Sequence, residues 1–367
     1  MFRAQLSVFL MLIFALFMGG CSSNESGLTE QQVEKLVHAA RPGNPSPDVW
    51  ARAIRESLIE IGQPVDKEHV CAVIAVIAQE SSFNIAPRNS RMAEILKSKI
   101  KASESNEVIQ FLIQTRLDQT ASNGRTFREN IDEISSEEDF ENWYNEFTSA
   151  GVTKPILLVL NKDISDLVTT IGSMQVSVKF AENYPKKPLN VGLGSLREVL
   201  YTCKGGVFYG SAYLLDYKHN YDDWKYVFAD FNAGHYASRN AGFQKMLADL
   251  SRKQIDLDGD LLNYSDGNSS PSVTYETFVE LLRKRGEEVD EGQIKKDFEK
   301  EKSYDFEKTD TYTKLAEMHK EKFGKSIYAV LPEIALNSPK FVSKNLSTKW
   351  FALRVKSIYS RCMRTRI

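Results

Sequence analysis

Residues 66–80 place the strongest constraint on the fold of this 367-residue chain. Asp66 is a favourable helix cap, and the segment from Val70 to Ala78 is almost wholly apolar. A helix that is apolar on every side must be surrounded by other elements, because any face left in water would expose hydrophobic surface. The segment therefore predicts a central helix inside a multi-helix body, with the acidic Glu80 at its end.

Helix signals also flank this central segment. Thr29 and Gln32 have the spacing of a capping box at the start of one helix. Pro47 at a first turn and Gly62 at an end frame a second helix, since these are the positions that proline and glycine prefer. Two aromatic-rich stretches are typical of further helices, at 208–217 and 221–231. The chain is therefore expected to be mainly α.

Changes in composition predict how the chain is divided. After a leader at 1–20 and a polar tether at 21–28, residues 29–250 are expected to form one helical domain. Within it, residues 88–168 look like a helical insertion with a polar surface that includes an acidic stretch. Residues 251–367 begin with turn-rich sequence and end in a basic segment, and we expect a helical extension that could pack on the same domain.

The leader has the order of a secretory signal. Arg3 precedes an apolar run that is too short to span a bilayer, and the small pair Gly19–Gly20 comes before Cys21. This order resembles a bacterial lipoprotein signal, which implies that the Cys21 thiol is lipidated and anchors the chain to a membrane. Ser22 after it implies, by the same resemblance, an outer-membrane lipoprotein facing the periplasm. The alternative is a plain secretory signal with an incidental cysteine.

Export would permit disulfide bonds. Cys71, Cys203 and Cys362 remain after the leader, so at most one bridge can form and one thiol is left over. Cys71 lies in the apolar helix and is expected to be a small core residue. Basic and acidic side chains number 47 and 49, which argues against a nucleic-acid binder because such proteins are usually strongly basic.

No cofactor or metal is expected. No two cysteines have the spacing of a zinc site, and the five histidines are scattered. Asp256, Asp258 and Asp260 alternate as calcium ligands do, but the loop lacks glycine at the sixth position and glutamate at the twelfth. An exposed turn is therefore predicted there.

Glu80 is the candidate catalytic residue. A carboxyl group at the end of an apolar helix loses water, which raises its pKa and lets it hold a proton near neutral pH. A glutamate at a helix end is ordinary by itself, but two later segments accompany it: IGSMQVS at 171–177 and ADFNAGHY at 229–236.

These three segments together resemble the soluble lytic transglycosylases of the lysozyme superfamily. The matching positions are Glu80, Ser81 and Phe83, then Gly172, Met174 and Gln175, then Phe231, Asn232, Ala233 and Gly234. The resemblance covers residues 66 to about 245 without the insertion, which is under half of the chain. It implies a lysozyme-like helical domain that acts on peptidoglycan glycan strands.

The resemblance and the side-chain chemistry assign the substrate contacts. Met174 offers an apolar wall, the Gln175 and Asn232 amides can hydrogen-bond to sugar groups, and Tyr236 can stack on a sugar ring. His235 is either a substrate contact or an incidental loop histidine. The substrate-binding residues expected are Ser81, Met174, Gln175, Phe231, Asn232, His235 and Tyr236.

A lytic transglycosylase needs one catalytic glutamate. The resemblance implies that Glu80 protonates the glycosidic oxygen and then takes the proton from the muramyl 6-hydroxyl, which closes into a 1,6-anhydro product. One alternative is a muramidase that adds water, in which Asp230 would be the second acid. Another is a non-catalytic glycan-binding or scaffold lipoprotein in which the insertion has reshaped the site.

Overall fold

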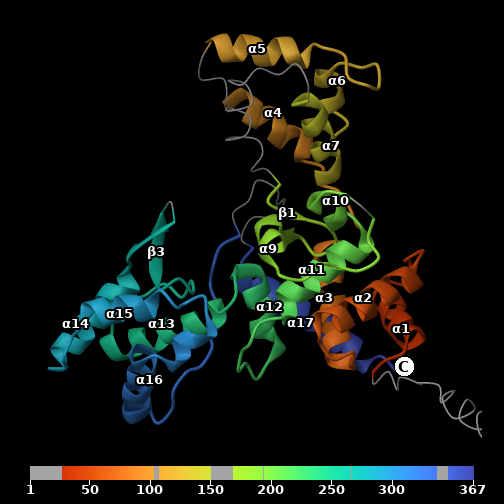
Figure 1. Cartoon of the computed structure of the whole chain (residues 1–367). Helices are drawn as coiled ribbons and strands as arrows, with labels where there is room; N and C mark the ends of the chain where they lie inside the picture. The colour runs from red at the N-terminus through yellow and green to blue at the C-terminus, as the bar shows by residue number, and fades with distance from the viewer. Residues whose placement is uncertain (1–26, 103–106, 150–167, 193, 266, 337–345) are drawn as a thin grey trace, which may run out of the picture.

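A computed structural model describes residues 27–102, 107–149, 168–192, 194–265, 267–336 and 346–367. The predicted leader, Cys21 and most of the tether lie outside these residues, so lipidation stays a prediction. The described chain is mainly helical, which confirms the expected class (Figure 1). No helix in this part of the chain combines the length and the apolar character needed to cross a bilayer.

The first body of the fold surrounds the apolar helix α3. All eight residues from Val70 to Ile77 are buried, as the sequence predicted. Helices α1, α2, α11 and α17 all contact α3, so each of its sides is covered. The helices of this body are α1 (Glu30–Ala40), α2 (Pro47–Ile61), α3 (Lys67–Glu80), α11 (Cys203–Leu215), α12 (Trp224–Ala233) and α17 (Thr348–Arg364).

The predicted helix caps are also confirmed. Thr29 and Gln32 make both bonds of a capping box, and the Asp66 carboxylate accepts a hydrogen bond from the backbone amide of His69. Pro47 occupies the first position of α2, and Gly62 ends it in the left-handed conformation. These helix boundaries follow from local chemistry alone.

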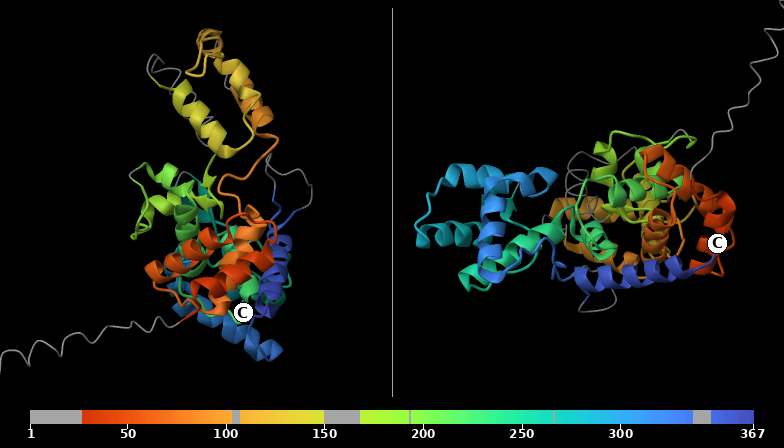
Figure 2. Two further views of the ribbon diagram at one scale, coloured as in Figure 1. Left: turned by 90° about the vertical axis from the view of Figure 1, so that its right-hand side faces the viewer. Right: turned by 90° about the horizontal axis from the view of Figure 1, so that it is seen from below.

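The predicted insertion forms an arm. Its helices have an aromatic core of their own, in which Trp143 and Phe147 stack with ring centroids 4.6 Å apart and Phe127 meets Phe147 edge-on at 5.3 Å. The arm extends away from the first body in two perpendicular views (Figures 1 and 2). Its helices are α4 (Met92–Ala102), α5 (Glu107–Leu117), α6 (Phe127–Ile131) and α7 (Glu137–Phe147).

Short elements connect the arm to the body. Strands β1 (Thr170–Ile171) and β2 (Val176–Ser177) pair antiparallel, with Thr170 opposite Ser177. Helices α9 (Val178–Asn183) and α10 (Leu196–Leu200) follow before α11. The β1–β2 turn contains the predicted Gly172–Gln175 motif.

A second hydrophobic cluster begins before the expected boundary at residue 250. Phe243 on α13 is fully buried and contacts Phe278, Phe298 and Phe306, so α13 belongs to this cluster. The expected extension 251–367 is divided, because α17 packs in the first body instead. The elements of the second cluster are α13 (Ala237–Ser251), β3 (Leu262–Ser265), β4 (Asn268–Pro271), α14 (Val273–Lys284), α15 (Glu291–Phe298), the 3-10 helix η2 (Tyr304–Lys308) and α16 (Asp310–Phe323).

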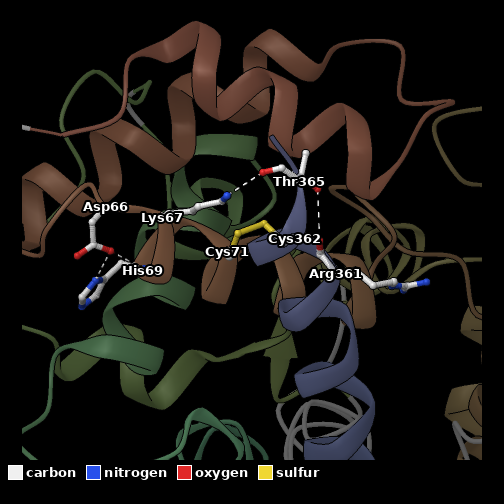
Figure 3. The surroundings of a disulfide bond; sticks show 7 residues. All are labelled: Asp66, Lys67, His69, Cys71, Arg361, Cys362 and Thr365. Carbon is white, nitrogen blue, oxygen red and sulfur yellow. Dashed lines mark hydrogen bonds and ion pairs between the residues drawn. A yellow bond between two sulfur atoms is a disulfide. The ribbon is translucent and has the colours of Figure 1, made fainter. Parts of the chain in front are cut away.

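A disulfide bond fixes α17 to the central helix (Figure 3). It joins Cys71 and Cys362, which lie 291 residues apart in sequence. The Lys67 ammonium group also donates a hydrogen bond to the Thr365 carbonyl oxygen at 2.7 Å. Cys203 is left as a half-buried free thiol, which confirms the expectation of one bridge and one unpaired cysteine.

Candidate active site

Glu80 is the last residue of α3, where the buried helix reaches a partly exposed position. Protein atoms crowd the carboxyl group and remove water from it, and the nearby negative charge of Glu137 repels a second charge. Both effects favour the neutral acid, and the pKa of Glu80 is raised to about 8. The site residue therefore has the proton-holding property that its sequence position predicted.

The chain turns sharply after Glu80. Ser82 and Phe83 both have positive φ angles, 52° and 62°, which side-chain-bearing residues rarely adopt. The Ser81 hydroxyl donates to the Ile77 carbonyl oxygen at 3.1 Å and accepts from the Asn84 amide at 3.3 Å. Ser81 is buried and stabilises this turn, so the substrate contact predicted for it is replaced by a structural role.

The β1–β2 turn brings Gln175 to the site. Gly172 has φ +81°, and a Cβ atom there would lie 2.4 Å from the Leu200 carbonyl oxygen, so only glycine fits. The Gln175 Oε1 accepts from the Thr170 hydroxyl at 3.1 Å, and its Nε2 donates to the Glu137 carboxylate at 3.2 Å. The prediction that Gln175 lies at the site is consistent with this geometry, and the structure adds that its amide holds a carboxylate.

Met174 does not line a cleft. Its side chain is fully buried and packs against α11, where a Cβ on Gly210 would come within 2.4 Å of the thioether sulfur. The prediction that Met174 forms an apolar wall for the substrate is therefore wrong, because its side chain packs the β1–β2 turn onto α11.

Glu137 is the site residue that sequence reasoning missed. It is the first residue of α7, only 5% exposed, and the turn before it is bound to the segment after Glu80 through the Asn89 amide and the Ser135 carbonyl oxygen at 2.7 Å. It lies in the acidic stretch that the sequence predicts to be polar surface of the insertion. The available signal was the serine cap at Ser136, which marks where the helix begins but not what it docks against.

One turn further along α7, Glu141 has a basic partner. Arg197 on α10 lies 2.7 Å from the Glu141 carboxylate, and its guanidinium also donates to the Val168 carbonyl oxygen at 2.8 Å. Burial raises the pKa of Glu141, while the Arg197 charge opposes that shift. This pair fixes the base of the arm against the body, so α7 holds Glu137 in a defined position.

The third predicted segment is anchored in the body. Phe231 is buried and meets Tyr213 at 5.4 Å between ring centroids, so the predicted sugar contact from Phe231 is replaced by core packing. Asn232 is partly exposed, and its Oδ1 accepts from the Thr348 hydroxyl of α17 at 2.8 Å. The Asn232 side chain thus remains a candidate substrate contact.

His235 and Tyr236 pack against other aromatic rings. The His235 ring is stacked between Tyr213 and Tyr217, at 4.5 and 4.0 Å, and its Nε2 lies 2.6 Å from the Tyr213 carbonyl oxygen. Burial lowers the pKa of His235. Tyr236 is buried and donates its hydroxyl to the Lys218 carbonyl oxygen at 3.1 Å. The substrate contact predicted for Tyr236 is therefore wrong, because its ring is buried. His235 is partly exposed, but its ring is held between Tyr213 and Tyr217, which favours the alternative of a histidine that does not contact substrate.

Asp230 also has a structural role. It is fully buried, and its carboxylate accepts hydrogen bonds from the Tyr221 hydroxyl at 2.7 Å and from the backbone amides of Tyr236 and Ser238 at 2.8 and 2.7 Å. Burial raises the pKa of Asp230 to about 6, although these hydrogen bonds favour the charged form. The second carboxylate beside Glu80 is Glu137, and Asp230 joins α12 to α13.

The alternating aspartates lie in the second cluster. They line a pocket of about 690 Å³ together with Gln244 and Tyr264. Asp258 accepts from the Gln244 amide at 2.7 Å and from the Asp260 backbone amide at 3.0 Å, as in an ordinary turn. Within the described residues, no three acidic, histidine or cysteine side chains gather as a metal site would require.

A family model described as "Protein of unknown function (DUF1615)" matches residues 43–365. The chain belongs to this family. The match extends from just before α2 to the end of α17, so the arm and the returning helix are part of the family's unit. The chain is also 33% identical over 365 residues to "Uncharacterized protein YaiW" of Escherichia coli K12, with 97% of each chain covered. No solved structure matches the chain.

Proposed function

We propose that this DUF1615 chain is a peptidoglycan lytic transglycosylase on a lysozyme-like fold. The observation that carries the proposal is the carboxyl group of Glu80, which holds a proton to a pKa of about 8 at the end of a buried helix. The resemblance of three short segments supports it. Two of these segments also meet at Glu137, because its charge acts on Glu80 and its carboxylate accepts a hydrogen bond from Gln175. The substrate would be the β-1,4 bond between N-acetylmuramic acid and N-acetylglucosamine.

In the proposed reaction, Glu80 acts as acid and then as base. Its proton moves to the glycosidic oxygen as the bond to muramyl C1 breaks. The Glu80 carboxylate then takes the proton of the muramyl 6-hydroxyl, and that oxygen bonds to C1 to give the 1,6-anhydro sugar. Glu80 ends protonated, as it began, and no water is consumed. A pKa near ambient pH suits both steps, because a strong acid would be a poor base.

The neighbouring residues have supporting roles in this proposal. Gln175 holds the Glu137 carboxylate beside Glu80 through its Nε2, so we assign it to positioning as well as to substrate contact. Asn232 is fixed through Oδ1, which leaves its Nδ2 to donate to an acetamido or hydroxyl oxygen. The turn at Ser82 and Phe83 fixes the direction in which the chain leaves Glu80.

A muramidase is the second candidate, and Glu137 is the observation that favours it. Glycosidases that add water use a second carboxylate to activate it, and Glu137 provides one beside Glu80. The two reactions differ in their products, because hydrolysis adds a water molecule to the muramyl sugar. The hydrolysed product is therefore heavier than the 1,6-anhydro product by one water. A mass spectrum of the released muropeptides separates them.

The experiment is turnover of purified cell-wall sacculi by the mature chain. The wild type is expected to release soluble muropeptides that end in 1,6-anhydro sugars, and Glu80→Gln is expected to release none. Glu133→Gln is the matched control, because this arm residue has a side chain 64% exposed to solvent. Equal release by wild type and Glu80→Gln would remove Glu80 from the mechanism, and sacculus binding without release by either would favour the non-catalytic binder.

The proposed location is the periplasmic face of the outer membrane, with a lipid anchor at Cys21. This proposal rests on the leader sequence alone. Metabolic labelling with a fatty acid tests it directly: label is expected on the wild type and should be absent from Cys21→Ala.

A further inference from the structure

Helix α17 is bound to two of the three segments of the candidate site. In its first turn, the Thr348 hydroxyl donates to Asn232 at 2.8 Å. Further along, the Arg354 Nε donates to the Gln79 side-chain oxygen at 2.8 Å, and Gln79 directly precedes Glu80. Thr348 and Arg354 are about 9 Å apart along a helix axis. The first half of α17 therefore lies alongside the site, although it follows Glu80 by more than half of the chain.

An exposed tryptophan lies on this part of α17. Trp350 is four residues before Arg354, so the two side chains share one helix face. The Arg354 guanidinium carbon lies 5.6 Å from the centre of the indole ring. Trp350 is 39% exposed, whereas Trp50 and Trp143 are buried and Trp224 is partly buried. It is thus the tryptophan that this chain leaves most open to a ligand.

We propose that Trp350 and Arg354 form a saccharide-binding subsite that extends the Glu80 site along α17. The proposal takes its substrate class, a glycan of N-acetylated sugars, from the proposed function. The apolar face of a pyranose ring stacks on the indole of Trp350, as apolar surfaces stack on aromatic rings elsewhere in proteins. The Arg354 Nη groups donate to sugar hydroxyls or to a stem-peptide carboxylate.

Gln79 makes this subsite rigid. Its contact with Arg354 is through Nε, so the guanidinium is fixed at one edge while its two Nη groups remain available as donors. The Cys71–Cys362 bond holds the far end of α17 to the same helix that carries Gln79 and Glu80. The subsite and the Glu80 carboxyl group are thereby attached to the same pair of helices. This reduces the entropic cost of binding a sugar chain, because fewer side chains have to be ordered on binding.

An anionic membrane surface is a different partner that this helix could suit, because α17 carries five basic residues and no acidic residue. The structure favours the glycan. Lys349 and Lys356 are already paired with Glu333 and Asp223, at 2.7 and 2.9 Å. Phe351 and Val355 are buried in the first body and cannot contact a lipid, whereas Leu353 is 48% exposed.

The test is binding of chitotetraose, a soluble tetramer of N-acetylglucosamine, to the mature chain with Glu80→Gln, which prevents turnover. Calorimetry gives the dissociation constant, and tryptophan fluorescence reports on the indole. We expect the ligand to shift the fluorescence of this parent protein, and Trp350→Ala to bind about tenfold more weakly. Trp350→Phe keeps an aromatic ring and is expected to bind with intermediate affinity.

Tyr264→Ala is the matched control, since Tyr264 is an aromatic residue 50% exposed in the second cluster. It should bind chitotetraose as the parent does. Unchanged affinity of a folded Trp350→Ala would overturn the subsite, and so would an absence of binding by the parent. Binding of the same proteins to vesicles of anionic lipid is measured in parallel. If Trp350→Ala keeps its affinity for chitotetraose but loses binding to these vesicles, Trp350 belongs to a membrane contact and the subsite is overturned. Sacculus turnover by the wild type decides the proposed activity separately from each of these outcomes.

Discussion

Replacing Glu80 by glutamine should stabilise the protein, and by an amount that grows with pH. The carboxyl group has a pKa of about 8 in the folded chain against an ordinary value of 4.5. Below pH 4.5 the carboxyl group is protonated in both the folded and the unfolded chain, so its ionisation does not change the free energy of unfolding. As pH rises, the unfolded chain ionises freely while the folded chain must keep the proton. The stability associated with the proton is therefore lost progressively up to pH 8.

The size of the effect follows from that shift. Each pH unit between the two pKa values lowers the free energy of unfolding of the wild type by about 1.4 kcal/mol. The loss relative to Glu80→Gln is about 3 kcal/mol at pH 7 and about 5 kcal/mol above pH 8. Water that reaches the partly exposed side chain reduces the penalty, so we expect at least about half of these values.

The assay is urea denaturation of the mature wild type and Glu80→Gln at a series of pH values from 5 to 9, followed by circular dichroism. The two free energies of unfolding should differ by less than about 1 kcal/mol at pH 5 and separate further as pH rises. Glu133→Gln, at an exposed position of the arm, should follow the wild type throughout. Coincident curves at every pH would refute the reasoning, because they would mean that Glu80 is fully hydrated. A difference that does not vary with pH would indicate a changed contact and not an ionisation.

Two other perturbations give expected outcomes. Glu137→Gln removes the charge that repels ionised Glu80, so the pKa of Glu80 should fall. The alkaline limit of sacculus turnover and the pH midpoint of the stability loss should therefore both move to lower pH. Glu133→Gln should shift neither, and an unmoved midpoint in Glu137→Gln would exclude Glu137 as a neighbour of Glu80. Reducing the Cys71–Cys362 bond, or changing both residues to serine, should lower the free energy of unfolding by about 2–5 kcal/mol, because the bond closes a very long loop in the unfolded chain. Urea denaturation with and without reductant measures this, and equal midpoints would show that the bond does not constrain the unfolded state.

The helices of the first body could be predicted because their signals are local. The apolar run of α3, the capping box at Thr29 and Gln32 and the glycine at 62 each act within a few residues. The disulfide partner of Cys71 could not be predicted, since it depends on where α17 packs after almost 300 residues. The division of residues 251–367 between two clusters has the same cause.

The candidate site divides in the same way. Glu80 was predicted from the apolar helix before it, and Gln175 from the resemblance of the segment 171–177. Met174 lies in the same segment as Gln175, and Tyr236 lies in the third segment, but the burial of a side chain depends on which helices cover it, and both are buried. His235 is partly exposed and stacks between two tyrosines. Glu137 looked like one charge in an acidic surface stretch until the arm placed it against the body.

The sequence alone determined where the helices begin and end and that a carboxyl group stands at the edge of an apolar helix, because caps and hydrophobic runs act over one or two turns. Tertiary structure decided what surrounds that carboxyl group. The arm brings Glu137 to it, and the returning helix brings Arg354 beside Gln79 and leaves Trp350 exposed. The free energy of a charge or an aromatic ring depends on the water and atoms around it, and distant segments of the chain supply those only once it has folded.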